Sequence, residues 1–157
     1  MTPQQRTTTA LAIATAIAVP AEGLRQYAYS DPPGILSVCY GYTGAVVVGK
    51  KYSLDECKAL LNKDMLDAIK TVDTCRKGLP IPVLAAFADA SYNIGPRIAC
   101  DSTKSTAARK LATGDIRGAC NELPKWNKTT IAGAKVALPG LTKRRAAEQE
   151  LCLTGVA

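Results

Sequence analysis

The stretch AEGLRQYAYSDPPGILSVCYGYTG, residues 21–44, marks a change of character along the chain. Residues 7–20, which come before it, are uncharged and helix-forming, whereas within it tyrosines and valines are interspersed with turn residues such as DPPG. We therefore predict a small antiparallel sheet of two or three short strands over residues 26–50, including the run at 45–48. Two carboxylates, Glu22 and Asp31, bracket the passage from the first helix into this sheet.

Helical patterns dominate the rest of the chain. Ser53 and Glu56 form a capping box, and apolar residues at helical spacing continue to about residue 73. The segment PVLAAFADASYN, residues 82–93, is nearly all apolar or small, so it should be the central buried helix. Further helices are predicted over residues 7–19 (broken at Pro20), 105–113, 115–123 and from Thr142 onward, with a loop over 124–141 that holds the only Trp, Trp126.

This order of elements predicts an α+β fold. A helix, a small sheet and then many helices indicate a β lobe inserted after the first helix and a larger, mostly helical lobe. The length of 157 residues fits one domain. We expect a cleft between the lobes, with Glu22 and Asp31 at their junction.

Charge and composition limit the classes of partner. The net charge is +7 with no histidine, and KRR at 143–145 is the only dense basic run. The simplest interpretation of this charge is a solvated basic surface. The more specific interpretation is that the protein binds a polyanionic partner such as an anionic membrane or a bacterial cell wall. Nucleic acid is not expected, because no binding signature for it occurs. Without histidine or a CxxC pair, neither a metal site nor another cofactor is expected.

The six cysteines are even in number, and six allow 15 connectivities. We predict three disulfides, with reduced core cysteines as the alternative. Neighbourhood along the chain favours the pairs Cys39–Cys57, Cys75–Cys100 and Cys120–Cys152. Disulfides require an oxidising compartment, so the protein should be exported.

The N-terminus offers a means of export. Residues 7–21 carry no charge and follow MTPQQR, which resembles the start of a signal peptide. The run is too short and too weakly hydrophobic for a secure membrane span of about 20 apolar residues. We therefore divide the chain into a weakly hydrophobic segment, 1–20, and a catalytic domain, 21–157; the alternative for residues 1–20 is an ordinary first helix.

The carboxylate pair suits the hydrolysis of a glycosidic bond, which needs no histidine. One carboxyl, kept protonated, donates to the leaving oxygen, and the other activates water or attacks the sugar. Glu22, half-buried between lobes, fits the first role, and Asp31, in a polar turn, fits the second. Ser37 could hold the water. A helix-ending Glu-Gly and a turn-starting Asp-Pro are also common structural features, so spacing alone does not establish catalysis.

The segment EGLRQYAYSDPPGILSVCYGYTG closely resembles the active-site region of phage-type lysozymes, glycoside hydrolase family 24. Further matches follow in order: YSLDECKALLNKDM, ASYNIG, GDIRGACNEL, and the spaced pattern W…AGAK…GL-x-x-RR-x-x-E. The resemblance covers about residues 21 to 153. Within the family, the chain is similar to endolysins of lambdoid phages, some of which carry a signal-arrest-release segment.

The resemblance implies a lysozyme-like fold and assigns roles to individual residues. Glu22 would be the general acid, Asp31 the carboxylate that activates water, and Ser37, where the family usually has Thr, would position that water. Tyr42, where many members have His, and the pair Tyr92 and Asn93 at a helix end would bind the sugar. The resemblance also matches Arg144, Arg145 and Glu148, for which a structural ion-pair cluster is the better interpretation.

The implied function is an endolysin, a muramidase that cleaves the β-1,4 bond between N-acetylmuramic acid and N-acetylglucosamine in peptidoglycan and lyses the host. It would act as a monomer in the host periplasm, after transient tethering to the inner membrane by residues 7–19. The alternatives are a lytic transglycosylase using Glu22 alone, and a cationic protein that binds membrane or wall without chemistry.

Overall fold

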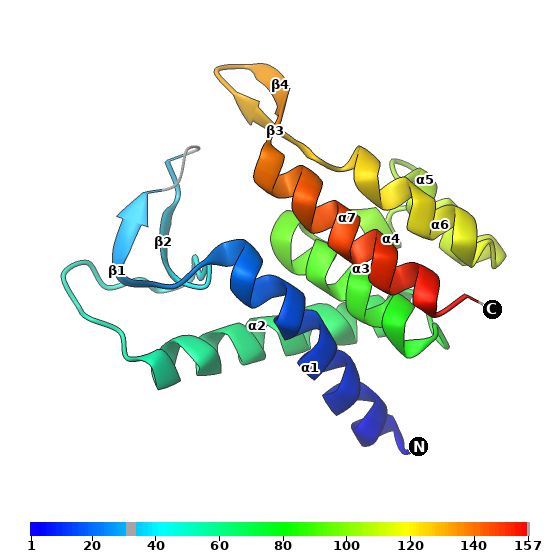
Figure 1. Ribbon diagram of the computed structural model, residues 1–157, viewed down its shortest axis with the longest axis horizontal. Helices are drawn as coiled ribbons and strands as arrows, with labels where there is room; N and C mark the ends of the chain where they lie inside the picture. Colours follow the sequence, from blue (N-terminus) through cyan, green and yellow to red (C-terminus); the bar gives the residue numbers. More distant parts are fainter. Residues whose placement is uncertain (31–33, 157) are drawn as a thin grey trace.

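The computed structural model describes residues 1–30 and 34–156 as a helical body with two small antiparallel sheets (Figure 1). In chain order the elements are α1 (Pro3–Glu22), β1 (Arg25–Ser30), β2 (Leu36–Cys39), α2 (Leu54–Cys75), α3 (Ile81–Ile94), α4 (Arg97–Cys100), α5 (Thr106–Thr113), α6 (Ile116–Glu122), the 3-10 helix η1 (Leu123–Lys125), β3 (Lys128–Ile131), β4 (Ala134–Ala137) and α7 (Pro139–Thr154). The β1–β2 hairpin follows α1 and stands apart from the helices α3 to α7, which confirms the predicted α+β class (Figure 1).

The first helix, α1, is longer than predicted at both ends. It begins at Pro3 and continues through Pro20 to Glu22, so the predicted break at Pro20 is wrong. Proline lacks an N–H and its ring crowds the carbonyl four residues earlier, which weakens a helix, and α1 ends only two residues after Pro20. The Gly23 N–H then donates to the Val19 carbonyl at 3.1 Å and closes the last turn.

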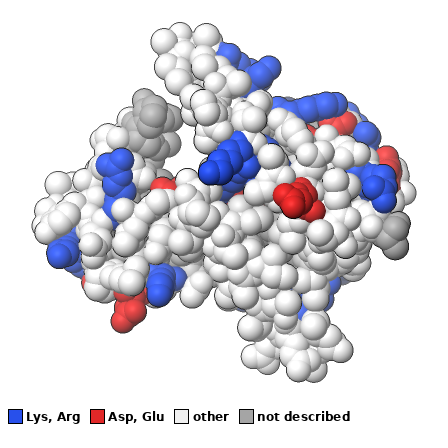
Figure 2. Space-filling view, in the orientation of Figure 1, with Lys and Arg blue, Asp and Glu red and all other residues white. Residues whose placement is uncertain are grey.

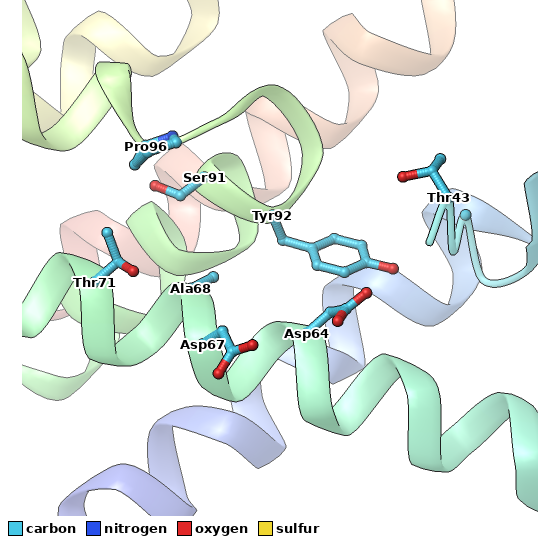
Figure 3. A pocket seen from close by; sticks show the side chains of 9 residues that line it. Thr43, Asp64, Asp67, Ala68, Thr71, Ser91, Tyr92 and Pro96 are labelled. Carbon is cyan, nitrogen blue, oxygen red and sulfur yellow. The ribbon is translucent and has the colours of Figure 1, made fainter. Parts of the chain in front are cut away.

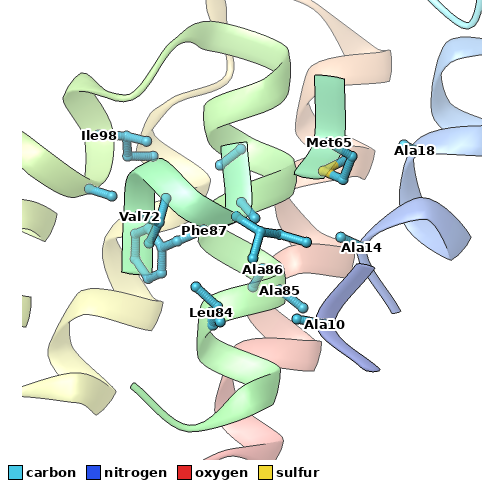
Figure 4. Packing of buried hydrophobic residues seen from close by; sticks show 14 of the residues in the cluster. Ala10, Ala14, Ala18, Met65, Val72, Leu84, Ala85, Ala86, Phe87 and Ile98 are labelled. Carbon is cyan, nitrogen blue, oxygen red and sulfur yellow. The ribbon is translucent and has the colours of Figure 1, made fainter. Parts of the chain in front are cut away.

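Small side chains hold α1 in the body of the protein. Ala10, Ala14 and Ala18, one turn apart on one face, are fully buried (Figure 4). That face packs against α2 and α3, and the short side chains let the helix backbones approach closely. Because Glu22 is the last residue of α1, this packing also fixes where its carboxylate lies.

The helix α3 lies at the centre of the core, as predicted. Residues 83–91 are all buried, and α3 packs against α1, α2 and α7. The facing side of α2 contributes the periodic apolar residues expected from the sequence, among them Leu61, Met65 and Ile69. Figure 4 shows Phe87 and Leu84 of α3 within this cluster.

The β lobe contains two strands, which agrees with the predicted two or three. β1 and β2 pair antiparallel, and one bridge between Val38 and Tyr42 extends the pairing. The predicted strand at 45–48 is wrong, because this segment pairs with no strand in the described residues. Its Val47 N–H donates instead to the Tyr52 hydroxyl at 3.1 Å, which shows that valine content alone does not make a strand.

A second hairpin occupies part of the predicted loop over 124–141. β3 and β4 pair with each other through a two-residue turn in which Ala132 and Gly133 have φ of 51° and 81°. All but one of their residues are exposed, so the strands are held by backbone hydrogen bonds rather than by burial. Their sequence has no alternation of apolar and polar residues that would predict a strand. The predicted start of the last helix near Thr142 is late, because α7 already begins at Pro139.

Three disulfides fasten the elements together, and they are the predicted pairs Cys39–Cys57, Cys75–Cys100 and Cys120–Cys152. The first ties β2 to α2, the second ties α2 to α4, and the third ties α6 to α7. Each bridge therefore adds a covalent link between two elements that are separate along the chain.

We expect replacement of Cys39 and Cys57 by serine to lower the free energy of unfolding by about 3 kcal/mol, since the bridge closes a loop in the unfolded chain. Urea titration measures the loss, and amide exchange should accelerate mainly in β1 and β2. The matched pair Cys120 and Cys152 should give a similar loss with faster exchange in α6 and α7. Identical exchange patterns in both variants would contradict these local roles.

Candidate active site

Glu22 lies at the junction of the two lobes. Its side chain is 17% exposed, and its Oε1 accepts a hydrogen bond from Arg144 Nη1 of α7. The other oxygen, Oε2, faces the loop after β2, where a Cβ on Gly41 would lie 2.5 Å away. Gly41 also has a φ of 80°, so both the space and the backbone require glycine there. The carboxylate is thus enclosed between a guanidinium and a backbone.

Arg144 joins Glu22 to the central helix. Its Nε and Nη2 donate to the two oxygens of Asp89 in α3 at 2.9 and 2.7 Å, a bidentate pair. Asp89 is fully buried and the Arg144 side chain is 3% exposed. Burial alone would lower the pKa of Arg144, but the contacts with Asp89 and Glu22 outweigh it and raise that pKa. The guanidinium stays charged.

A second arginine extends the cluster deeper into α7. Arg145 donates from Nη2 to Glu148 Oε1 and to Asn93 Oδ1, each at 2.8 Å. Its Nε lies 2.7 Å from Glu148 Oε2, with both side chains fully buried. The interpretation of Arg144, Arg145 and Glu148 as an ion-pair cluster is therefore confirmed, with the addition that Arg144 also reaches Glu22.

The position of Glu148 within this cluster shifts its pKa. Burial and, next, a hydrogen bond with Asp89 raise the pKa of Glu148 to about 10, although Arg144 and Arg145 act in the opposite direction. A carboxyl that keeps its proton costs less to bury than a charged one.

The hydroxyl residues of the β lobe occupy different settings. Ser37 in β2 is 2% exposed, and its hydroxyl lies 3.4 Å from the Ile35 carbonyl, a long and weak hydrogen bond. The Tyr42 hydroxyl accepts from the Ala45 N–H at 3.3 Å, so it closes its own loop. Asp31 lies outside the residues that the structure describes. The predicted roles of Ser37, Tyr42 and Asp31 therefore stay predictions.

Of the two predicted residues at the end of α3, Tyr92 is the one that faces a cavity. Its hydroxyl donates to the Tyr40 carbonyl at 2.6 Å. Burial raises the pKa of Tyr92, and the nearby charges of Glu22 and Asp64 raise it further. Asn93 instead uses its amide oxygen on Arg145.

A cavity of about 290 Å³ lies between the loop after β2 and the helices α2 and α3 (Figure 3). Its lining includes Gly41, Thr43, Asp64, Asp67, Ser91 and Tyr92, from the loop after β2 and from α2 and α3. Since Gly41 touches both this cavity and Glu22, the two belong to one cleft region.

Sequence reasoning missed Asp89 and Asp64 as members of this region. Asp89 is the single charge in an otherwise apolar helix, and a buried charge requires a partner of opposite sign. That signal, together with the Arg144–Arg145 pair, was available in the sequence. Asp64 stands on a polar face of α2 and carries no such signal.

A half-buried carboxylate at the junction of a β lobe and a helical lobe, beside a polar cavity, is typical of lysozyme-like glycoside hydrolases. The chain belongs to the phage lysozyme family, whose model, described as Phage lysozyme, matches residues 19–148. It is a glycoside hydrolase. This confirms the fold and the family that the motifs predict.

Individual relatives agree with this assignment. The SAR-endolysin of Bacteriophage PS119 is 41% identical over 136 residues, which cover 85% of this chain and 77% of that protein. The active form of P1 phage endolysin Lyz is similar in structure, with a TM-score of 0.78 and 25% identity over 92% of this chain and 85% of that one. The secreted inactive form of the same endolysin reaches a TM-score of 0.53 at 24% identity, covering 73% and 77% of the two chains.

We expect Glu148 to make stability depend on pH. In the unfolded chain the carboxyl of Glu148 has a pKa of about 4.3. Above that pH it must therefore take up a proton when the chain folds. The stabilisation it provides is complete below that value and is lost as pH rises towards the folded pKa of about 10. Between about pH 5 and 9, Glu148→Gln should therefore show a flatter fall in unfolding free energy than the natural chain.

Urea titration across that pH range tests this dependence. The control is Glu150→Gln, which removes a carboxylate from an exposed position on α7 and should follow the natural chain. Parallel pH curves for the natural chain and Glu148→Gln would show that Glu148 is ionised in the folded protein.

Proposed function

We propose that the protein is an endolysin that hydrolyses the β-1,4 bond between N-acetylmuramic acid and N-acetylglucosamine in bacterial peptidoglycan. One observation carries the proposal: Glu22 is enclosed between Gly41 and Arg144 at the lobe junction of a phage lysozyme, beside an open cavity. The net charge of +7 favours an anionic wall, and Lys and Arg are spread over the visible surface (Figure 2). The enzyme acts as a monomer.

Glu22 is the general acid of the proposed reaction. Arg144 contacts its Oε1, so Oε2 is the oxygen that carries the proton to the leaving glycosidic oxygen. Protonation of the leaving group assists cleavage as positive charge develops on the sugar ring. Arg144 and Asp89 fix the carboxylate in one orientation, so little reorganisation is needed.

Asp31 is the second carboxylate, which activates the attacking water, and Ser37 positions that water. In the sequence Asp31 comes directly after Ser30, the last residue of β1, and Ser37 stands on β2, which pairs with β1. Tyr42, Tyr92 and Asn93 bind sugar in this proposal. Of these three, Tyr92 has the direct support that it lines the cavity beside Glu22.

Replacement of Glu22 by glutamine should lower the rate of peptidoglycan cleavage at least about a hundredfold, because glutamine cannot donate the proton. Turbidity loss of purified peptidoglycan measures the rate. Asp31→Asn should cause a comparable loss in a hydrolase, whereas Glu150→Gln should retain full activity. Unchanged cleavage by Glu22→Gln would refute the role of Glu22.

The products separate the two enzymatic alternatives. A hydrolase leaves reducing muramic acid ends, whereas a lytic transglycosylase leaves anhydromuramic ends and keeps its activity when Asp31 becomes asparagine. Mass spectrometry of the released fragments distinguishes the two.

We further propose that the chain reaches the host periplasm by export, with residues 7–19 as a transient membrane tether. Within residues 1–30 and 34–156, no helix is long and apolar enough to cross a membrane. Support comes instead from the disulfides, which need an oxidising compartment, and from the position of α1. A tethered α1 could not pack through Ala10, Ala14 and Ala18, so Glu22 would leave its site.

Two leucine variants of α1 test this tether. Ala12→Leu adds hydrophobicity on the exposed face of α1 and should increase the membrane fraction without loss of stability. Ala14→Leu adds the same hydrophobicity but overpacks the core, so it should also lower stability by about 1–3 kcal/mol. Fractionation of expressing cells, with thiol titration, measures the distribution. A protein found only in the cytoplasm with free thiols would exclude export.

A further inference from the structure

We propose that the cavity beside Glu22 binds a primary ammonium group of the peptidoglycan substrate between Asp64, Asp67 and Ser91. This inference rests on the proposed function and adds a determinant of substrate choice to it. The cavity lies where α2 and α3 face each other, with Tyr92 and Asp64 on its lining (Figure 3).

The lining of this cavity is acidic although the protein is basic. Asp64 and Asp67 stand on neighbouring positions of α2, three residues apart, and both line the cavity. No Lys or Arg is among the described residues that line it. Within residues 1–30 and 34–156, neither carboxylate forms an ion pair or hydrogen bond with a side chain, so both can accept from a ligand.

A buried hydroxyl at the same cavity independently indicates a ligand. Ser91 of α3 is 6% exposed, and its Oγ has no hydrogen-bond partner among the described residues. An unpartnered buried hydroxyl costs free energy that a partner would recover. Ser91 lines the cavity together with Thr71, whose hydroxyl is also on the lining (Figure 3). The two carboxylates, where ionised, only accept hydrogen bonds, and the hydroxyl oxygens of Ser91 and Thr71 can accept as well.

An ammonium group fits that set. It has three donors and no acceptor, and its charge suits two unpaired carboxylates. Burial raises the pKa of Asp64, and the charge of Asp67 raises it further, against the opposing effect of Lys63. A cation between the two carboxylates would remove their mutual repulsion.

Peptidoglycan offers two sources of a primary ammonium: the side-chain amine of a diamino acid in the stem peptide, and a glucosamine that has lost its acetyl group. The volume of about 290 Å³ exceeds what an ammonium group occupies, since a water molecule takes about 30 Å³. The surplus accommodates an alkyl chain and favours the stem peptide. A ligand there is part of the substrate, because Gly41 borders both the cavity and Glu22.

The test compares cleavage of four substrates: peptidoglycan with free stem-peptide amines, the same material after chemical acetylation of those amines, glycan strands freed of peptides by an amidase, and such strands after partial removal of N-acetyl groups. For Asp67→Asn we expect KM to rise about fivefold on the free-amine substrate, with kcat little changed and no effect on the acetylated one. Glu150→Gln removes the same charge elsewhere and should match the natural chain on all four.

A second variant separates binding from folding. Ser91→Ala removes the unpartnered hydroxyl, so its unfolding free energy should be unchanged or higher, while KM on the free-amine substrate rises about threefold. If Asp67→Asn raises KM on the de-acetylated strands but not on the stem-peptide substrate, the ammonium that binds belongs to the sugar. Equal effects of Asp67→Asn on free-amine and acetylated substrates, or no effect on any, would overturn the proposal.

Direct binding keeps this inference separate from the proposed function. Calorimetry of Glu22→Gln with a soluble disaccharide peptide carrying a free diamino-acid amine should show binding that Asp67→Asn weakens about fivefold. Such binding without any cleavage by the natural chain would refute the muramidase and leave the ammonium site standing. Cleavage by the natural chain with binding indifferent to Asp67 and to acetylation would refute the ammonium site alone.

Discussion

The buried guanidinium of Arg144 is the contact on which the arrangement of the site depends. It lies on α7, binds Asp89 of α3 through two hydrogen bonds, and reaches Glu22 at the end of α1. Three helices that are distant in sequence are thereby joined at one side chain. Burying this charge is costly, and removal of either carboxylate would leave it poorly compensated. The position of Glu22 is therefore set by electrostatics as well as by packing.

The cost of that charge explains the composition of its surroundings. Arg144 and Arg145 bring two positive charges into the interior, where the carboxyl groups of Asp89, Glu22 and Glu148 contact them. Burial and a hydrogen bond with Asp89 raise the pKa of Glu148, which lowers the cost of burying this carboxyl beside Arg145. An apolar cluster of the same volume could be equally stable, but it could not orient a carboxylate. The cluster is thus better explained by specificity of geometry than by stability.

The sequence predicts the helices well because their signals are local. The capping box at Ser53, the apolar run of α3 and the cysteine neighbourhoods all point to features that the structure contains. The β3–β4 hairpin is exposed and stands without an apolar pattern, so nothing in its residues distinguishes it from a loop.

The sequence predicts those parts of the candidate site that depend on residues close together in the chain. Glu22 could be predicted because it ends a helix beside a predicted lobe junction. Its contact with Arg144 spans 122 positions in sequence and belongs to the tertiary fold. The same holds for the cavity, whose lining comes from α2, α3 and the loop after β2 and shares no sequence pattern.

The small residues of α1 reconcile two demands on one segment. Leucine in place of Ala10, Ala14 or Ala18 would make the helix more apolar, but leucine would not fit where α1 contacts α2 and α3. Alanine packs there at close distance and leaves the helix only weakly hydrophobic. A weakly hydrophobic segment gains little from a bilayer, so the folded body can compete for it. In the export route proposed above, the packing that draws α1 out of a membrane would also complete the active site, because Glu22 ends this helix.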